Sequence, residues 1–205
     1  MKEETANNFS IGFTATPVED FSATVDFYSV KIKDRIVLTG AFDQSDPQIG
    51  ADLVALNVGA AQFFTNALDT KTTGVDVILT YAKSFDRNNL RFSFAGNFNN
   101  MKLGSIKTSP KLAGKENTYF GTREQKFLLA SAPPSKISFS TDYSRERCHA
   151  NLRFTHFGKV TLEDWVAADN VYDAKLTTDL SLGYDISDNV TFILGAANLF
   201  DVYPK

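Results

Sequence analysis

Apolar and polar side chains alternate along most of this chain, in short segments separated by polar connections. The plainest segment covers residues 137–143. In it, Ile137, Phe139 and Tyr143 point to one side of an extended strand, and the serines between them point to the other. Because this pattern recurs from one end of the chain to the other, it predicts a large antiparallel sheet, and it indicates no catalytic site.

Eight segments of this kind form four hairpins, so the pattern predicts an all-β fold, an antiparallel up-and-down meander of about eight strands. The connections within the hairpins are short and lie at residues 17–20, 84–89, 144–147 and 185–189. The connections between the hairpins are long and lie at residues 39–60, 102–134 and 158–171. We therefore expect all short turns at one end of the sheet and all long loops at the other.

The same pattern predicts three element boundaries. The third strand begins as early as Phe63, and the eighth strand runs from Val190 to Phe200. Within the second long connection, residues 123–132 are expected to form a short helix that the pair Pro133–Pro134 ends.

Sorted connections are typical of a transmembrane β-barrel, which has short periplasmic turns and longer extracellular loops. Tyr81, Tyr143 and Tyr184 each end the apolar face of a strand just before a short turn. Three phenols at one level predict an aromatic girdle at a membrane interface. The apolar face would then contact lipid, and the polar face would line a hydrated lumen.

Composition narrows the class of protein. The chain has 205 residues, a net charge of −3 and a pI near 5.4, so no basic field favours nucleic acid as a partner. A hydrophobic content of 43% argues against disorder. The single cysteine, Cys148, excludes an internal disulfide framework. No apolar run has the length of a membrane-spanning helix, and Met1–Thr5 lead into no apolar signal segment.

Residues that could carry chemistry are few. His149 and His156 lie an odd number of positions apart, hence on opposite faces, and no cysteine or carboxylate is expected in ligand register with them. Asp43, Asp46 and Asp52 crowd the first long loop, but their spacing does not match a calcium loop. We expect no catalytic residues, no metal site and no cofactor, and therefore no enzyme.

Four further stretches are informative: residues 64–67 (FTNA), 73–77 (TGVDV), 195–204 (GAANLFDVYP) and the loop 121–136. Together they resemble the C-terminal part of TonB-dependent outer-membrane receptors. The Asn-Leu-Phe-Asp element at 198–201 is the most specific of these, and the resemblance extends over nearly the whole chain.

The resemblance implies a segment of a 22-stranded transmembrane β-barrel in a Gram-negative outer membrane. Residues 1–205 would be a C-terminal barrel fragment that lacks the plug, the TonB-contacting segment, a secretion signal and the final strand. TonB would act only through the missing N-terminal region. The resemblance implies active uptake of a scarce nutrient complex, most often an iron–siderophore, with haem, cobalamin or a glycan as alternatives.

The partners expected are membrane lipid on the apolar face and the nutrient complex at the long loops, with no nucleic acid. Ligand contacts in the loops are assigned to Arg123, Glu163, Asp164 and Trp165. The helical residues 123–126 are otherwise expected to face solvent. An isolated chain would have to bury its apolar face by self-association, by inside-out closure of its eight strands or in detergent.

Two other classes of protein fit parts of the pattern. A soluble, eight-stranded lipocalin-like barrel would bind one small ligand in an apolar interior, and periodicity alone does not decide which face points inward. An adhesive or structural β-sandwich is the third class, and the sorted loops disfavour it.

Overall fold

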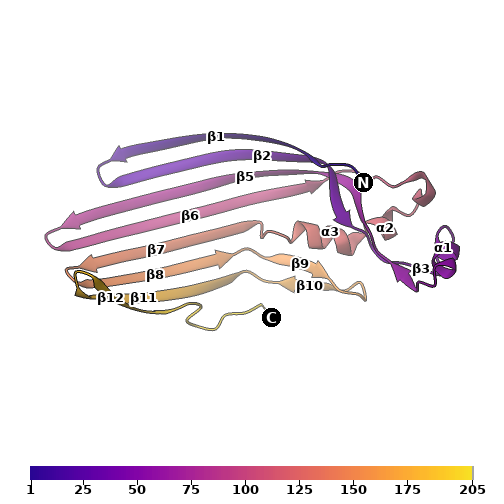
Figure 1. The fold of residues 1–205 in the computed structure, drawn as a ribbon. Coiled ribbons are helices and arrows are strands. Elements are labelled where there is room, and N and C mark those ends of the chain that lie inside the picture. The colour runs from indigo at the N-terminus through magenta and orange to yellow at the C-terminus, as the bar shows by residue number, and fades with distance from the viewer. Residues whose placement is uncertain (205) are drawn as a thin grey trace.

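The computed structural model describes residues 1–204 and consists mainly of one antiparallel sheet (Figure 1). The eight strands lie in the order β1-β2-β5-β6-β7-β8-β11-β12, each paired with its neighbours along the chain. Their bounds are β1 Thr5–Val18, β2 Phe21–Leu38, β5 Phe64–Phe85, β6 Asn88–Leu103, β7 Ser135–Arg145, β8 Cys148–Phe157, β11 Lys175–Ser187 and β12 Val190–Ala196. The predicted up-and-down meander is confirmed.

The connections are sorted as predicted. Four two-residue turns lie together at one end of the sheet, and the three long connections lie at the other (Figure 1). Asp20, Asp86 and Glu146 occupy three of these turns with positive φ, the backbone conformation that tight hairpins require. The two ends are called the turn end and the loop end below.

The long connections carry small elements that the alternation did not predict. The first holds β3 (Phe42–Asp43), α1 (Gly50–Ala55) and β4 (Ala60–Ala61). The second holds a 3₁₀ helix (Pro110–Leu112), α2 (Glu116–Tyr119) and α3 (Thr122–Leu129), and the third holds β9 (Val160–Glu163) and β10 (Asp169–Tyr172). Within residues 1–204 no helix is both long and apolar enough to cross a membrane.

The predicted boundaries hold only in part. β5 begins at Phe64, close to the prediction, whereas α3 starts one residue earlier and ends three residues earlier than predicted. The predicted end of the eighth strand at Phe200 is wrong, because β12 ends at Ala196. Asn198 has a φ of 49°, which turns the chain out of the strand, and the Leu199 amide then donates to the Thr178 carbonyl at 2.7 Å.

The register sorts side chains by polarity. On one face Val25 lies opposite Val77, Phe94 opposite Phe139, and Leu182 opposite Leu194. On this face many apolar side chains are exposed to solvent. Phe13, for example, is 69% exposed. On the other face Asp26 lies opposite Asp76, and Asp76 opposite Asn97. The two faces are called the apolar face and the polar face.

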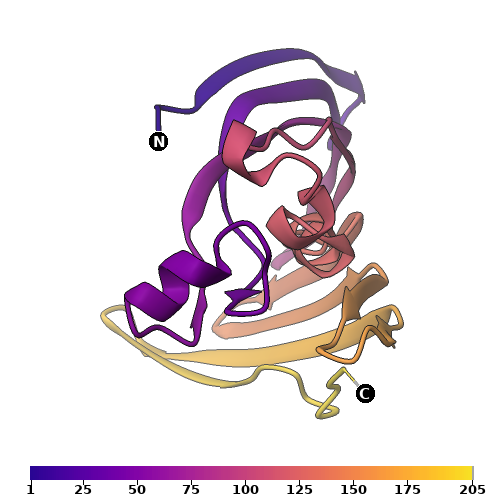
Figure 2. The same cartoon turned by 90° about the vertical axis from the view of Figure 1, so that its right-hand side faces the viewer.

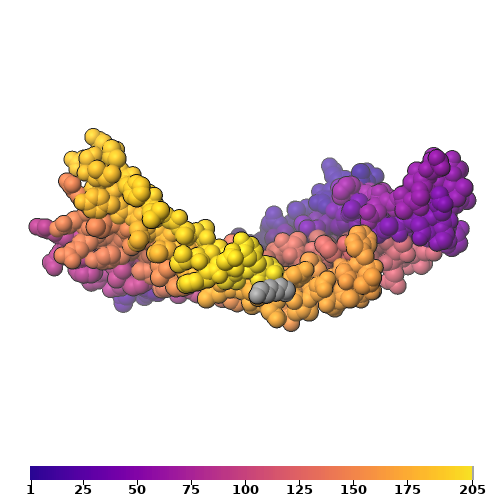
Figure 3. All heavy atoms as spheres, turned by 90° about the horizontal axis from the view of Figure 1, so that it is seen from below, coloured from indigo at the N-terminus to yellow at the C-terminus, as the bar shows by residue number. Residues whose placement is uncertain are grey.

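The sheet is curled but open (Figure 2). Among residues 1–204, β1 and β12 do not pair with each other, so each presents a free edge, and the β12 edge with the C-terminal residues (yellow) is seen in Figure 3. A hollow of about 440 Å³ lies on the polar face and is lined by side chains that include Arg91, Asp142, Asn151 and Ser181. The polar face is therefore concave and the apolar face convex.

This arrangement corrects two expectations. A lipocalin-like barrel needs a closed sheet with an apolar interior, but here the sheet is open, and charged and polar side chains such as Arg91, Asp142 and Asn151 reach into the hollow. Inside-out closure of the eight strands is also absent among the described residues, because the apolar side chains stay exposed on the convex side.

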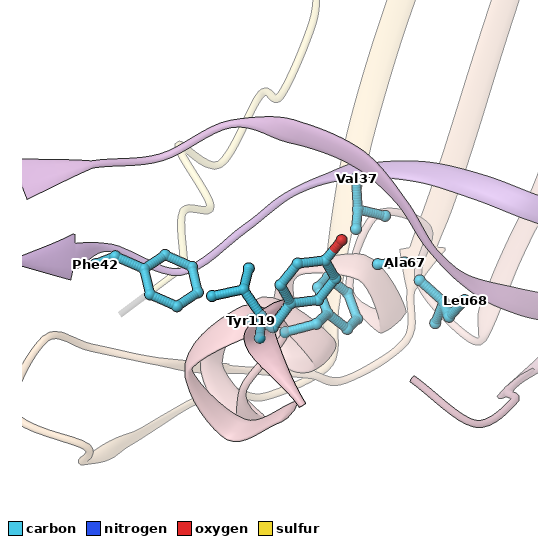
Figure 4. Packing of buried hydrophobic residues seen from close by; sticks show 7 residues of the cluster. Val37, Phe42, Ala67, Leu68 and Tyr119 are labelled. Atoms are coloured by element: carbon cyan, nitrogen blue, oxygen red, sulfur yellow. The ribbon is translucent and has the colours of Figure 1, made fainter. Parts of the chain in front are cut away.

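Buried apolar packing is concentrated at the loop end (Figure 4). The cluster consists of Val37, Phe42, Ala67, Leu68, Leu112, Tyr119 and Phe120. Tyr119, in α2, points toward the strands, where its hydroxyl lies 2.7 Å from the Thr65 hydroxyl. The first two long connections are thus packed on the extended ends of β2 and β5.

Candidate functional site

All four residues predicted to contact a ligand gather at one place on the loop end. Arg123 lies in the first turn of α3, Glu163 ends β9, and Asp164 and Trp165 form the turn between β9 and β10. The helix α3 begins at this point because the Gly121 amide donates to the Glu124 carboxylate at 3.1 Å. Helix α3 packs against β9, so residues about forty positions apart become neighbours.

Arg123 is held between two aromatic rings. Its guanidinium carbon lies 3.7 Å from the centroid of the Trp165 ring and 4.5 Å from that of Phe127. A guanidinium over an aromatic face is attracted by the ring quadrupole. One guanidinium nitrogen also lies 3.6 Å from the Glu124 carboxylate. The arginine therefore joins α3 to the β9–β10 turn, and Trp165 itself remains largely exposed.

The two acidic residues of the predicted site are engaged within the protein. The Lys126 ammonium donates to the Glu163 carboxylate at 2.7 Å and also to Asp169 of β10. These bonds, the one to Asp169 first, raise the pKa of Lys126. Asp164 accepts from the amides of Val166 and Ala168 at 2.9 and 3.0 Å, which closes its own turn.

The expectation that residues 123–126 face solvent is wrong. All four are partly buried against β9 and β10 or against the preceding loop, whereas Phe127 and Leu129 on the same helix are exposed. The partners of Arg123 and Lys126 come from a hairpin distant in sequence, so the helical residues alone give no sign of this burial.

A second group of charges fastens the long connection between β6 and β7 to the sheet. The Lys107 ammonium bonds to Asp34 at 3.1 Å and to Asp69, and Lys2 also pairs with Asp34 at 2.8 Å. Hydrogen bonds from Lys2 and then Lys107 lower the pKa of Asp34, and the bond from Lys107 lowers that of Asp69. The same bonds, to Asp69 first, raise the pKa of Lys107.

The aspartates of the first long loop do not form a common site. Asp46 pairs with Lys115, and the amide of Gln48 is the main cause of its lowered pKa. Asp52 pairs with Lys111. In the part of the chain that the structure describes, no group of three or more His, Cys, Asp or Glu side chains is arranged to hold a metal ion.

The polar face carries a cross-strand network. The Asn97 amide donates to the Asp76 carboxylate at 2.6 Å and to the Tyr28 hydroxyl at 3.2 Å. Gly74 leaves room for the Tyr28 ring, which lies where a Cβ would be. Near the turn end, His149 and Asp185 lie 2.7 Å apart, which corrects the expectation that no carboxylate lies in register with this histidine.

The family model described as TonB dependent receptor-like, beta-barrel, matches residues 1–199. No curated protein sequence matches the chain significantly.

Solved structures share the fold. They include the outer membrane transporter YddB from Escherichia coli, with a TM-score of 0.66 at 13% identity over 99% of this chain and 29% of that one. The FrpB iron transporter from Neisseria meningitidis has a TM-score of 0.65 at 16% identity, over 99% of this chain and 28% of that one. The siderophore receptor PirA from Acinetobacter baumannii gives 0.61 at 16% identity, over 97% and 28%. The chain thus spans less than a third of each of these proteins.

Proposed function

The chain belongs to the family of TonB-dependent receptor-like β-barrels, and from this premise we propose that it forms part of the wall of an outer-membrane receptor for a scarce nutrient complex. Residues 1–205 supply the C-terminal part of the barrel. Further strands of the receptor pair with the free edges of β1 and β12. The plug occupies the concave polar face, and TonB acts through an N-terminal region outside this chain.

One observation carries the membrane placement: the sheet has an exposed apolar convex face and a polar concave face. The tyrosines support it. In register, Tyr81 is level with Phe92 and Thr141, and Tyr143 lies two residues nearer the turn end. Likewise Tyr143 is level with Leu182, and Tyr184 lies two residues beyond.

The phenols thus shift by two residues for every two strands. Two residues span about 6.8 Å along a strand, and two strands span about 9.6 Å across the sheet. The line through the phenols is therefore inclined at about 35° to the direction perpendicular to the strands. Strands of outer-membrane barrels tilt by about 35–45°. The three phenols therefore lie level in a membrane whose lipid the apolar face contacts.

The nutrient complex in this proposal is an iron–siderophore, bound at the loop end. The proteins compared above include one named as a siderophore receptor and one as an iron transporter. Trp165 offers an exposed ring, and Arg123 beside it offers a positive charge for an anionic chelate. Glu163 and Asp164 act in the same site by holding the β9–β10 turn in place.

Uptake by cells tests this function. A strain that lacks the receptor gene and the same strain carrying the gene are supplied in turn with ferric catecholate and hydroxamate siderophores, haem, cobalamin and a maltooligosaccharide. We expect accumulation of a ferric siderophore that stops when a protonophore is added or TonB is deleted. Trp165→Ala should weaken binding of that chelate roughly tenfold, whereas the neighbouring Val166→Ala should not. If none of these probes is taken up in an energy-dependent manner, the proposal fails.

A further inference from the structure

Three lysines stand side by side on the sheet. Lys31 of β2 lies directly opposite Lys71 of β5, which lies directly opposite Lys102 of β6. Lys71 is an even number of residues from Val75 and Val77, so the group lies on the apolar face. The Cβ atoms of directly opposite residues are about 5 Å apart. This group of three is called the lysine row.

No carboxylate neutralises the lysine row. All three side chains are exposed, and within residues 1–204 none of their ammonium groups lies at salt-bridge distance from an acid. Asp34 and Asp69, the nearest acids along β2 and β5, are already bonded to Lys2 and Lys107. Like charges directly opposite each other destabilise a sheet, so an anion bound from outside the protein would stabilise the lysine row.

The position of the row along the strands indicates where that anion lies. Lys71 and Tyr81 are ten residues apart on the same face of β5, which corresponds to about 33 Å along the strand. With a tilt near 40°, this length covers about 25 Å of height, the thickness of the apolar band of an outer-membrane barrel. The tyrosines mark the boundary of this band nearer the turn end, and Lys71, the middle member of the lysine row, marks the boundary nearer the loop end.

We propose that Lys31, Lys71 and Lys102 bind the phosphate groups of anionic lipid headgroups in the leaflet around the loop end. The inference rests on the membrane placement of the proposed function. Toward the turn end, Phe27, Val75 and Phe98 lie opposite one another on the same face. One lipid can therefore place its acyl chains on this apolar row and its phosphate on the ammonium groups. Lys33, two residues beyond Lys31 and also exposed, extends the site.

Native mass spectrometry of the receptor in neutral detergent micelles tests this inference with phosphatidic acid and phosphatidylcholine as probes. The test variant carries Lys31→Gln, Lys71→Gln and Lys102→Gln. The control variant carries Arg91→Gln, Lys136→Gln and Arg153→Gln, which remove the same charge from the polar face. Heat-dependent electrophoretic mobility after transfer to phosphatidylcholine vesicles reports insertion of each protein.

We expect the wild-type protein and the control variant to bind phosphatidic acid in preference to phosphatidylcholine. A lysine near an anionic lipid surface contributes about fivefold in affinity, so the test variant should bind on the order of 100-fold more weakly. Added salt should weaken wild-type binding.

Three results would overturn the inference alone: equal binding by the test variant, equal weakening in the control variant, or displacement of the lipid by an equal concentration of inorganic phosphate. If the wild-type receptor does not insert into vesicles, the membrane placement fails, and the proposed function fails with it.

Discussion

The guanidinium of Arg123 lies over the ring of Trp165, with 3.7 Å between the guanidinium carbon and the ring centroid. This contact joins a helix of the second long connection to a hairpin of the third, and Lys126 repeats the connection through Glu163. Trp165 is the only tryptophan of the chain, so its fluorescence reports on this junction alone. The second and third long connections are therefore joined at two points.

Arg123→Gln should loosen the β9–β10 turn, because a cation–π contact at a partly exposed site is worth about 0.5–1 kcal/mol. We expect lower emission anisotropy of Trp165 and easier quenching by acrylamide. Arg87→Gln, which alters an ion pair at the turn end, is the matched control and should leave both signals unchanged. Identical quenching of wild type and Arg123→Gln would show that the stack does not hold the turn.

The ion pairs of Lys107 should make attachment of the long connection between β6 and β7 dependent on pH. The pKa values of Asp34 and Asp69 are lowered in the folded protein. Their contribution to the stability of the attached loop is therefore complete above the pKa of an aspartate in the unfolded chain, about 3.9, and is lost as the pH falls through the pKa values of the folded protein. The pKa of Lys107 is raised in the folded protein. Its contribution to the same stability is therefore complete below the pKa of a lysine in the unfolded chain, about 10.4, and is lost as the pH rises through the pKa of the folded protein. The loop should thus stay attached from about pH 4 to about pH 10.

A fluorophore on Ser109→Cys, in a Cys148→Ser background, measures this attachment, because Ser109 is exposed two residues from Lys107. Its anisotropy should stay constant through neutral pH and fall only in acid below about pH 4 or in alkali above about pH 10. In Lys107→Gln it should be low at every pH. A wild-type transition near neutrality would contradict the assignment.

Gly74→Ala should destabilise the sheet. A Cβ at this position would lie 2.3 Å from the Tyr28 ring and 2.6 Å from the Phe98 carbonyl, and the carbonyl belongs to a paired strand that cannot move aside. Overpacking of this kind costs about 1–3 kcal/mol. Gly195→Ala is the control, since its nearest neighbours are at 3.5 Å or more. Urea unfolding in lipid vesicles should separate the two variants, and equal midpoints would be the contrary result.

Asn198 should stabilise the exit from β12. Its side chain accepts from the Val202 amide at 3.0 Å and donates to the Val202 carbonyl at 3.1 Å, while its own backbone has positive φ. Asn198→Gly loses both bonds, about 1–3 kcal/mol together, and Asn198→Ala adds strain of about 1–2 kcal/mol. Hydrogen exchange at Val202 should therefore quicken in the order wild type, glycine variant, alanine variant. An alanine variant that exchanges like wild type would rule out this role.

The sheet was predictable because strand side chains alternate with a period of two, and one face of this sheet is apolar over most of the distance between the lysine row and the three tyrosines. Ile137, Phe139 and Tyr143 therefore revealed both the strand and its face. The turns were predictable for a related reason, since two polar residues between alternating segments leave little freedom.

The loop end was not predictable in the same way. β3, β4, β9 and β10 have two to four residues each, too few for alternation to be visible. Pairing across long connections is also hidden, because no short turn sets the register. His149 and Asp185 meet only because β8 and β11 pair across residues 158–174. The end of β12 was missed because the apolar pattern continues past Asn198, where the backbone turns.

Spin labels placed one at a time at residues 76–80 of β5, in a Cys148→Ser background and in lipid vesicles, test most directly which face meets lipid. Ile78 is the decisive position, because it is apolar but lies on the polar face between Val77 and Leu79. The account predicts that collision with oxygen, which dissolves in lipid, is highest at Val77 and Leu79, and that collision with a water-soluble nickel chelate is highest at Asp76, Ile78 and Thr80. Highest oxygen collision at Ile78, or no alternation along the strand, would contradict it.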